Sequence, residues 1–301
     1  MRLIHGRLIS ICSVVVMIAI AATPAKADPP RVIATIAPLH SLVASVMAGI
    51  GEPDLLLSGP VSPHDFAMAP SDVRRIAAAD LVIWVGAPLE SFLVKPLDDA
   101  GDRQLALLKV PGLDAVPFDS GGDGSDSAGP DPHIWLDPVR AIAIVTAVVD
   151  RLSRIDPDNA ATYRANAADI SDRLAALDEA IRARLQPVAS RPFIAFHDAY
   201  GYFSRRYGLQ PAGYFAVDPQ RRPGARTIAR LADLVSAGTV ACAFVEPQFD
   251  ARIVEAIAAG QPLRIGRLDP LGVDLEPGPA LYKTLLKANT ESIADCLGGT
   301  G

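Results

Sequence analysis

The chain has 301 residues, of which 50% are hydrophobic and 21% are charged. This ordinary globular composition excludes an intrinsically disordered chain and a coiled coil. Without the first 27 residues, which are considered next, 25 basic side chains stand against 34 acidic ones, a net charge of about −9, and this argues against nucleic acid as a partner.

Residues 1–27 have the pattern of a secretory signal peptide. Two arginines precede an apolar run over 8–22, and a small-x-small cleavage site ends at Ala27. The run has about 15 residues, fewer than the roughly 20 apolar residues that a membrane-spanning helix needs. We therefore expect this segment to be removed on export and the mature protein to be soluble.

The first half of the mature chain alternates short β-branched runs with helical patterns. Leu81 to Val85 is fully apolar, which is typical of a strand buried on both faces of a parallel sheet. Pro70 and Ser71 mark the start of a helix. We expect strands over 32–36, 54–57, 81–85 and 104–110, and helices over 39–47, from 70 onward and over 138–155.

A helical pattern over 157–185 follows, and after it the alternation resumes. These roughly 28 residues would span about 42 Å as a helix, enough to run past both halves of the molecule. We expect strands over 193–196, 211–217, 240–245 and 262–268, and helices over 200–207, 223–237, 249–259 and 279–297.

The sequence therefore predicts an α/β fold with two (β/α) lobes of mainly parallel sheets, joined by one long rigid helix. We assign 28–156 to the N-terminal lobe, 157–186 to the linking helix and 187–301 to the C-terminal lobe.

Four side chains with metal-binding groups follow predicted strands: His64, His133, His197 and Asp269. The carboxyl ends of the strands line the ligand crevice in open α/β sheets, so we expect all four in one cleft between the lobes. One histidine at a strand end is more often a hydrogen-bonded structural residue. Three imidazoles and a carboxylate together form a set well suited to zinc.

Two other residues are weaker candidates for this cleft. His40 begins the first helical pattern, and Glu246 follows the apolar run over 240–245, where it also fits a turn that ends a strand. Three aspartates adjoin the candidate histidines in sequence and could orient their rings: Asp65, Asp131 and Asp198.

Two cysteines, Cys242 and Cys296, remain after export, because Cys12 lies inside the apolar run of the signal segment. An oxidising compartment favours one disulfide between them. Two buried free thiols are the alternative.

Several segments, in this order, resemble the periplasmic zinc-binding proteins of ABC-type zinc-uptake transporters, the ZnuA-like members of the metal-binding solute-binding proteins. The segments are Ser62-Pro63-His64-Asp65-Phe66 with Pro70-Ser71-Asp72-Val73, Ala79-Asp80-Leu81-Val82-Ile83-Trp84-Val85-Gly86, Pro132-His133-Ile134-Trp135-Leu136-Asp137-Pro138, Phe196-His197-Asp198-Ala199-Tyr200-Gly201-Tyr202-Phe203, Val245-Glu246-Pro247-Gln248-Phe249 and Leu268-Asp269-Pro270-Leu271-Gly272.

The resemblance covers nearly the whole mature chain. It implies two lobes joined by a rigid helix, with the metal between them. His64, His133 and His197 match the three histidine ligands of the family, and Asp269 matches a position where many members have a carboxylate. Cys242 and Cys296 match a disulfide of zinc-specific members.

The chain departs from its relatives at two places. Many relatives have a histidine-rich loop before the second ligand, whereas residues 119–131 contain aspartates and no histidine, which puts a metal-capturing role of this loop in doubt. Some relatives have a glutamate just before the first histidine, where this chain has Pro63. Proline cannot bind a metal, so Asp269 or water is left as the fourth ligand.

The expected metal is zinc. Manganese-binding members of the wider group have a carboxylate where His197 stands, and a third imidazole favours zinc over that harder ligand set.

We predict that this periplasmic protein captures Zn²⁺ and delivers it to an ABC transporter permease for import, as a monomer and without enzymatic activity. One alternative is a solute-binding protein for manganese or another divalent metal. Another is a zinc hydrolase, because three histidines with an open fourth position are also a catalytic pattern. The sequence has no His-Glu-x-x-His and no Gly-x-Ser-x-Gly motif, which argues against the hydrolase.

Overall fold

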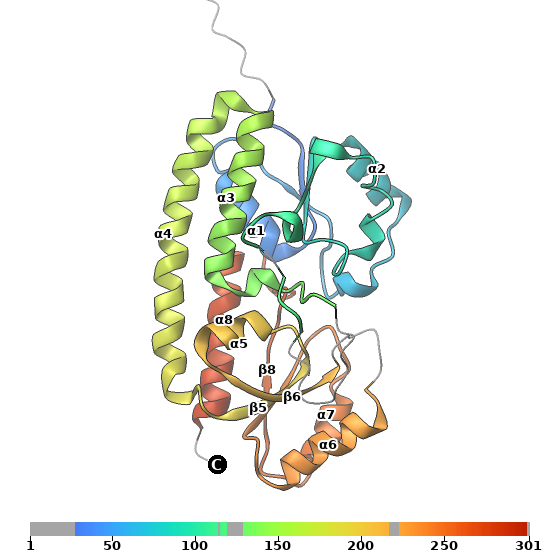
Figure 1. Cartoon of the computed structure of the whole chain (residues 1–301), viewed down its shortest axis with the longest axis vertical. Helices are drawn as coiled ribbons and strands as arrows, with labels where there is room; N and C mark the ends of the chain where they lie inside the picture. The colour runs from blue at the N-terminus through green and yellow to red at the C-terminus, as the bar shows by residue number, and fades with distance from the viewer. Residues whose placement is uncertain (1–27, 114, 119–128, 217–222, 300–301) are drawn as a thin grey trace, which may run out of the picture.

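The computed structural model describes residues 28–113, 115–118, 129–216 and 223–299. It has two α/β lobes stacked along the long axis of the molecule (Figure 1). The predicted signal peptide and most of the loop over 119–131 lie outside the described residues. No helix in the described ranges is long and apolar enough to cross a membrane.

The N-terminal lobe has a sheet of four parallel strands in the order β2-β1-β3-β4. All four residues of β3 are buried, as the apolar sequence predicts. The strands are β1 (Val32–Ala34), β2 (Asp54–Leu55), β3 (Leu81–Trp84) and β4 (Gln104–Ala106), with helices α1 (Ala37–Val46) and α2 (Pro70–Ala78).

The C-terminal lobe repeats this arrangement, with parallel strands in the order β6-β5-β7-β8. Its strands are β5 (Pro192–His197), β6 (Gln210–Ala216), β7 (Cys242–Val245) and β8 (Arg264–Arg267). Its helices are α5 (Gly201–Tyr207), α6 (Ala225–Ser236), α7 (Arg252–Ala258) and α8 (Leu281–Gly298).

One long helix connects the lobes, and another in the N-terminal lobe leads into it. Helix α3 (Pro138–Ile155) begins where Asp137 accepts the Val139 N–H at 2.9 Å. A short 3₁₀ turn (Pro157–Asn159) then leads into α4 (Ala160–Leu185). Helix α4 packs against α1, α3, α5 and α8, so it contacts elements of both lobes, as the 157–185 pattern predicts.

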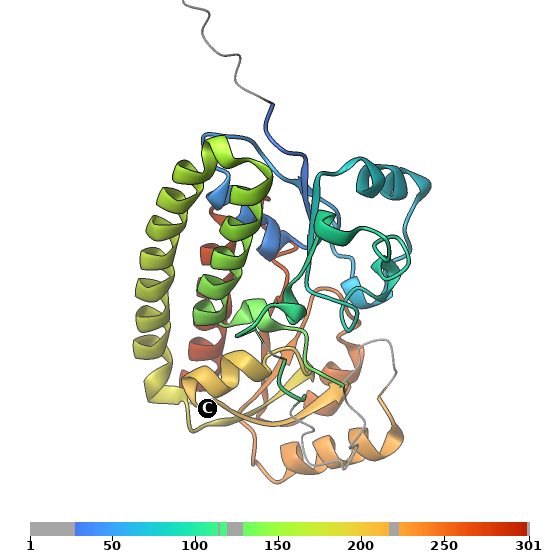
Figure 2. The ribbon, with the colours of Figure 1, turned by 45° about the horizontal axis from the view of Figure 1, so that its top comes forward.

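The C-terminal helix also runs between the lobes, which the sequence did not indicate. Helix α8 packs against α1 of the N-terminal lobe as well as α4 and β8. Helices α3, α4 and α8 lie side by side along one side of the molecule (Figures 1 and 2). One continuous apolar core includes residues from β1, β3, α3, α4, β5, β7 and α8, so the two lobes are packed as one body.

Several predicted strands are shorter than expected, and the difference is largest over 104–110. The pattern over 104–110 predicted a single strand, but the chain leaves the sheet after Ala106 and forms a 3₁₀ turn over Leu107–Lys109. Only three residues pair with β3 here, while the buried Leu107 continues the apolar pattern without sheet pairing.

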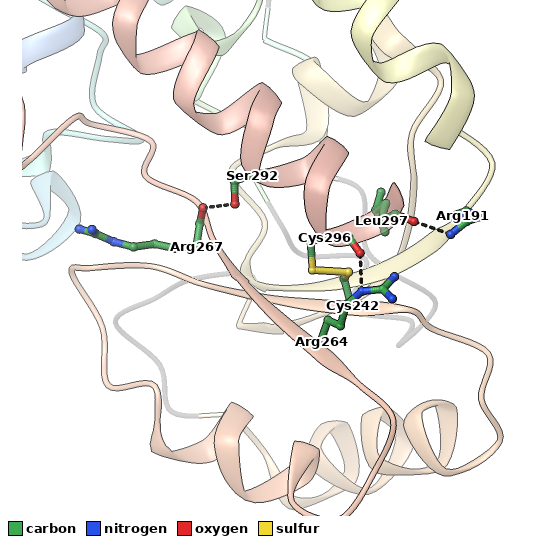
Figure 3. The surroundings of a disulfide bond; sticks show 7 residues. All are labelled: Arg191, Cys242, Arg264, Arg267, Ser292, Cys296 and Leu297. Atoms are coloured by element: carbon green, nitrogen blue, oxygen red, sulfur yellow. Dashed lines mark hydrogen bonds between the residues drawn. A yellow bond between two sulfur atoms is a disulfide. The ribbon is translucent and has the colours of Figure 1, made fainter. Parts of the chain in front are cut away.

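The predicted disulfide between Cys242 and Cys296 is confirmed. It joins the start of β7 to the end of α8 (Figure 3). Arg264 reinforces this junction, because its Nε donates to the Cys296 carbonyl at 2.7 Å. The bond closes a 54-residue separation, for which loop entropy gives about 4 kcal/mol of stabilisation.

Glu90 is a buried carboxyl group at the carboxyl ends of β1 and β3. It is fully buried, hydrogen-bonds to Thr35 and accepts the Gly86 N–H at 2.9 Å. Burial raises its pKa from 4.5 to about 7, although these hydrogen bonds oppose the shift. Glu90 therefore resists ionisation in the folded chain more than in the unfolded chain.

The Glu90→Gln variant tests this directly. Because the pKa is raised, the free energy of unfolding of the wild type falls as the pH rises from about 4.5 to about 7. Glutamine stays neutral and adds no such pH dependence. Over this interval the wild type should lose about 3 kcal/mol of stability relative to Glu90→Gln, and the difference should stay constant above it, as measured by urea unfolding at several pH values. A pH-independent difference between the two proteins would contradict this account.

Candidate metal centre

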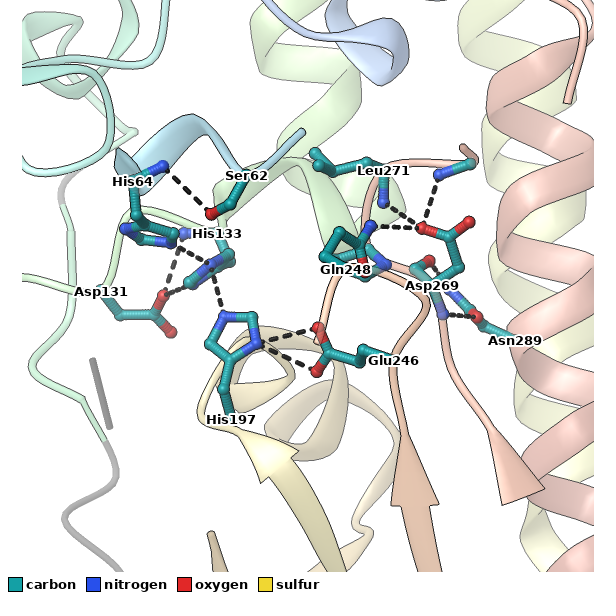
Figure 4. A network of polar contacts seen from close by, with 12 residues as sticks. Ser62, His64, Asp131, His133, His197, Glu246, Gln248, Asp269, Leu271 and Asn289 are labelled. Atoms are coloured by element: carbon teal, nitrogen blue, oxygen red, sulfur yellow. Dashed lines mark hydrogen bonds and ion pairs between the residues drawn. The ribbon is translucent and has the colours of Figure 1, made fainter. Parts of the chain in front are cut away.

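Three histidines lie at the facing edges of the two lobes (Figure 4). His64 belongs to a 3₁₀ turn (Pro63–Asp65) after β2, and its N–H donates to Ser62 Oγ at 3.3 Å. His133 directly precedes another 3₁₀ turn (Ile134–Leu136). His197 is the last residue of β5. All three therefore stand at or beyond the carboxyl ends of strands, as predicted.

The Nε2 atoms of these rings converge on one point. His133 Nε2 lies 3.4 Å from His64 Nε2 and 3.2 Å from His197 Nε2, and one ligand atom from each ring lies within 4.8 Å of the others. Tetrahedral zinc with bonds of 2.0–2.1 Å places its nitrogen ligands about 3.4 Å apart. The three rings therefore fit a four-coordinate metal ion at their centre.

Buried carboxylates hold two of the three rings from behind. His133 Nδ1 lies 2.8 Å from Asp131 Oδ1, and His197 Nδ1 lies 2.9 and 3.0 Å from the two oxygens of Glu246. A carboxylate that accepts the Nδ1 proton leaves the Nε2 lone pair of the neutral ring available to a metal. Asp131 fills the orienting role predicted for it, whereas Glu246 fills the role expected of Asp198.

The ring charges follow from burial and these partners. Burial and the two neighbouring imidazoles lower the pKa of His64 to about 2. Burial, followed by His197, lowers the pKa of His133 well below its usual value. Burial also acts to lower the pKa of His197, but Glu246 outweighs it and the pKa is raised overall. Hence the His64 and His133 rings are neutral at pH 7, as metal ligands must be.

Helix α5 braces the segment that carries His133. Tyr202 Oη donates to the Asp131 carbonyl at 2.9 Å, and the Arg205 guanidinium lies 3.8 Å from Asp131 Oδ2. A Cβ on Gly201 would lie 2.9 Å from the same oxygen, so a larger residue here would force the Asp131 carboxylate to shift. Burial raises the pKa of Asp131 to about 7, against the opposing effects of the His133 N–H and Arg205.

The structure does not bring Asp269 into the histidine cluster. Its Oδ1 accepts from Gln248 Nε2 at 3.0 Å and from the N–H groups of Leu271 and Gly272 at 2.9 Å. Its Oδ2 accepts the Val273 N–H at 2.7 Å. In the described ranges, the three histidines alone form a group able to share an ion. Asp269 instead shapes the turn after β8.

His40 lies apart from the cluster, and its Nε2 is 3.0 Å from the Pro53 carbonyl oxygen. Asp65, next to His64, is exposed. Sequence reasoning missed the role of Glu246, because 49 residues separate it from His197. The available signal was its position at the end of β7, which pairs directly with β5.

Comparison with known proteins assigns a family to this architecture. Residues 32–296 match the family model ZnuA, described as the periplasmic component A of the zinc-uptake complex. The high-affinity zinc uptake system protein ZnuA of Brucella abortus is 35% identical, and the alignment covers 88% of this chain and 91% of that protein.

The fold is found in several solved structures. A zinc-bound deletion mutant of ZnuA superposes with a TM-score of 0.78 at 26% identity, over 91% of this chain and all of the other. The periplasmic zinc-binding protein TroA of Treponema pallidum gives 0.80 at 25% identity, over 89% of this chain and 99% of that one.

Glu246→Gln tests the orienting role of Glu246. Glutamine keeps an oxygen acceptor but loses the charge, so zinc affinity should fall about 10- to 100-fold. Titration against a chromophoric chelator measures this, with Glu255→Gln on the exposed side of α7 as the charge-matched control. Equal affinities in both variants would show that the carboxylate does not act through His197.

Proposed function

The chain belongs to the ZnuA family of periplasmic zinc-uptake components and binds Zn²⁺ for uptake; we propose that His64, His133 and His197 capture the ion and that a membrane permease of an ABC transporter receives it. The observation that carries the ligand assignment is the convergence of three Nε2 atoms from both lobes at the spacing of a tetrahedral site.

The donor set favours zinc over harder ions. Three imidazoles, two of them made more basic by carboxylates at Nδ1, suit a borderline metal such as Zn²⁺. Manganese prefers oxygen ligands in an octahedral arrangement. The manganese alternative is therefore less well supported by these residues than zinc.

The fourth ligand is Asp269 or water. To bind the ion, the Asp269 carboxylate would have to give up hydrogen bonds from Gln248 and from three backbone N–H groups. Each such bond to a charged group contributes about 1.5–3 kcal/mol. A small ligand such as water needs no rearrangement of this turn.

The shape of the site favours carriage over catalysis. The cavity that adjoins the three histidines has a volume of about 10 Å³, which is about the room that one water molecule needs. This space does not hold the reacting group of an ester, phosphate or peptide together with a metal-bound water. Glu246, a nearby carboxylate that could act as a general base, is hydrogen-bonded to His197. We infer that the protein has no hydrolase activity.

Release to the permease should need only small motions, because the lobes share one apolar core and direct hydrogen bonds. Trp135 Nε1 donates to the Pro270 carbonyl at 2.8 Å, and Tyr282 Oη donates to the Trp135 carbonyl at 2.6 Å. We therefore propose that loops near the ligands move while the lobes keep their orientation, and that the protein acts as a monomer.

Single alanine variants of the ligands test the assignment. One zinc ion should bind per mature chain, and His64→Ala, His133→Ala and His197→Ala should each weaken binding by about 100-fold or more, because each removes a metal–nitrogen bond. Isothermal calorimetry with chelator competition measures both stoichiometry and affinity. Asp269→Ala should weaken zinc less than any histidine change.

His40→Ala serves as the control, since His40 lies outside the cluster. Two equivalent zinc sites per chain, or wild-type affinity in His133→Ala, would overturn the proposed ligand set.

A further inference from the structure

A single four-residue turn after β7 places three side chains around the metal centre. The turn runs from Glu246 to Phe249 and is closed by the Phe249 N–H, which donates to the Glu246 carbonyl at 3.2 Å. Glu246 holds His197, and Gln248 donates to Asp269. The proposed zinc binding assigns a role to Glu246 but leaves Phe249 unexplained.

The Phe249 ring is fixed against both the metal centre and the core of the C-terminal lobe. It meets the His197 ring edge to face, with centroids 5.6 Å apart and planes at 77°. On its other side it stacks on Phe196 at 4.9 Å and 11°, and Phe196 stacks in turn on Phe215 at 6.2 Å. Such contacts give Phe249 one preferred position.

Phe249 also forms a wall of the cavity beside the three histidines. The other walls are mostly apolar or already hydrogen-bonded, and they include Pro63, Trp135, Pro270 and Leu271. The cavity volume of about 10 Å³ leaves room for about one water-sized ligand. An ion that needs three ligands beyond the imidazoles cannot complete its shell there.

One residue of the cavity wall carries a buried polar atom without a hydrogen-bond partner in the described part of the chain. Gln248 lines the cavity, and its Oε1 is buried with no hydrogen-bond partner among the described residues. Its Nε2 is engaged with Asp269, which fixes the direction of the amide. A buried acceptor of this kind suits a donor such as a metal-bound water.

We propose that Phe249 is a specificity-determining residue, whose ring closes the cavity and limits an ion held by His64, His133 and His197 to one further small ligand. This limit accepts four-coordinate zinc and rejects ions such as Mn²⁺ that prefer six ligands. The inference rests on the ligand set proposed above and deepens it, because it assigns metal selection to a side chain that does not touch the ion.

Cobalt substitution tests the proposal, because the visible spectrum of Co²⁺ distinguishes four-coordinate from six-coordinate sites. The mature wild-type protein should give a four-coordinate spectrum. Phe249→Ala should open space for additional water and move the spectrum toward six-coordinate. The same change should raise Mn²⁺ affinity relative to Zn²⁺ by about tenfold or more.

Two control variants distinguish loss of the cavity wall from a general loss of packing. Phe249→Leu keeps an apolar wall and should retain the four-coordinate spectrum. Phe215→Ala removes a ring of the same stack that does not line the cavity, so it should lower thermal stability without changing the spectrum or the Mn²⁺ to Zn²⁺ ratio.

An unchanged cobalt spectrum and metal preference in Phe249→Ala would overturn the proposal, as would the same change in Phe215→Ala. If the proposed ligand set is wrong, the result is different: a protein with His133→Ala as its single substitution still binds cobalt. That outcome would remove the basis of this inference together with the proposed site.

Discussion

The metal centre depends on holding three imidazole lone pairs within one ion's reach, although the rings come from segments 69 and 64 residues apart. Electron pairs that point at one another repel, and burial removes the water that would otherwise screen them. The fold accepts this arrangement because the two lobes share one apolar core. A cation at the centre relieves the repulsion, so the fixed positions of the rings favour metal binding.

Burial of the rings also explains why carboxylates contact two of them at Nδ1. An isolated buried carboxylate is costly, but Asp131 and Glu246 each pair with a ring nitrogen. Their negative charge faces the ion through the ring, which makes Nε2 a better donor. Helix α5 adds Tyr202 and Arg205 to the Asp131 side. The proposed site is therefore built from both lobes in two layers, the proposed ligands and the groups that orient them.

Much of this arrangement could be predicted from sequence, because it depends on local patterns. The apolar β3 and the proline start of α2 mark their elements plainly, and the position of histidines after strands places them at the facing edges of the two sheets. Pairing across distant segments could not be predicted in this way. Asp198 adjoins His197 in sequence, yet Glu246 holds the ring, because β7 lies beside β5 in the sheet. The length of β4 and the packing of α8 on α1 likewise depend on tertiary contacts.

Asp269 resembled a ligand by position, although an aspartate before Pro-Leu-Gly is also typical of a side chain that accepts from backbone N–H groups in a turn.

X-ray absorption at the zinc edge of the loaded mature protein tests the central claim most directly, since it reports the number, type and distance of the atoms bound to the ion. The account predicts three imidazole nitrogens and one oxygen at about 2.0–2.2 Å. A six-coordinate shell of longer bonds, or a shell with fewer than three imidazoles, would contradict it.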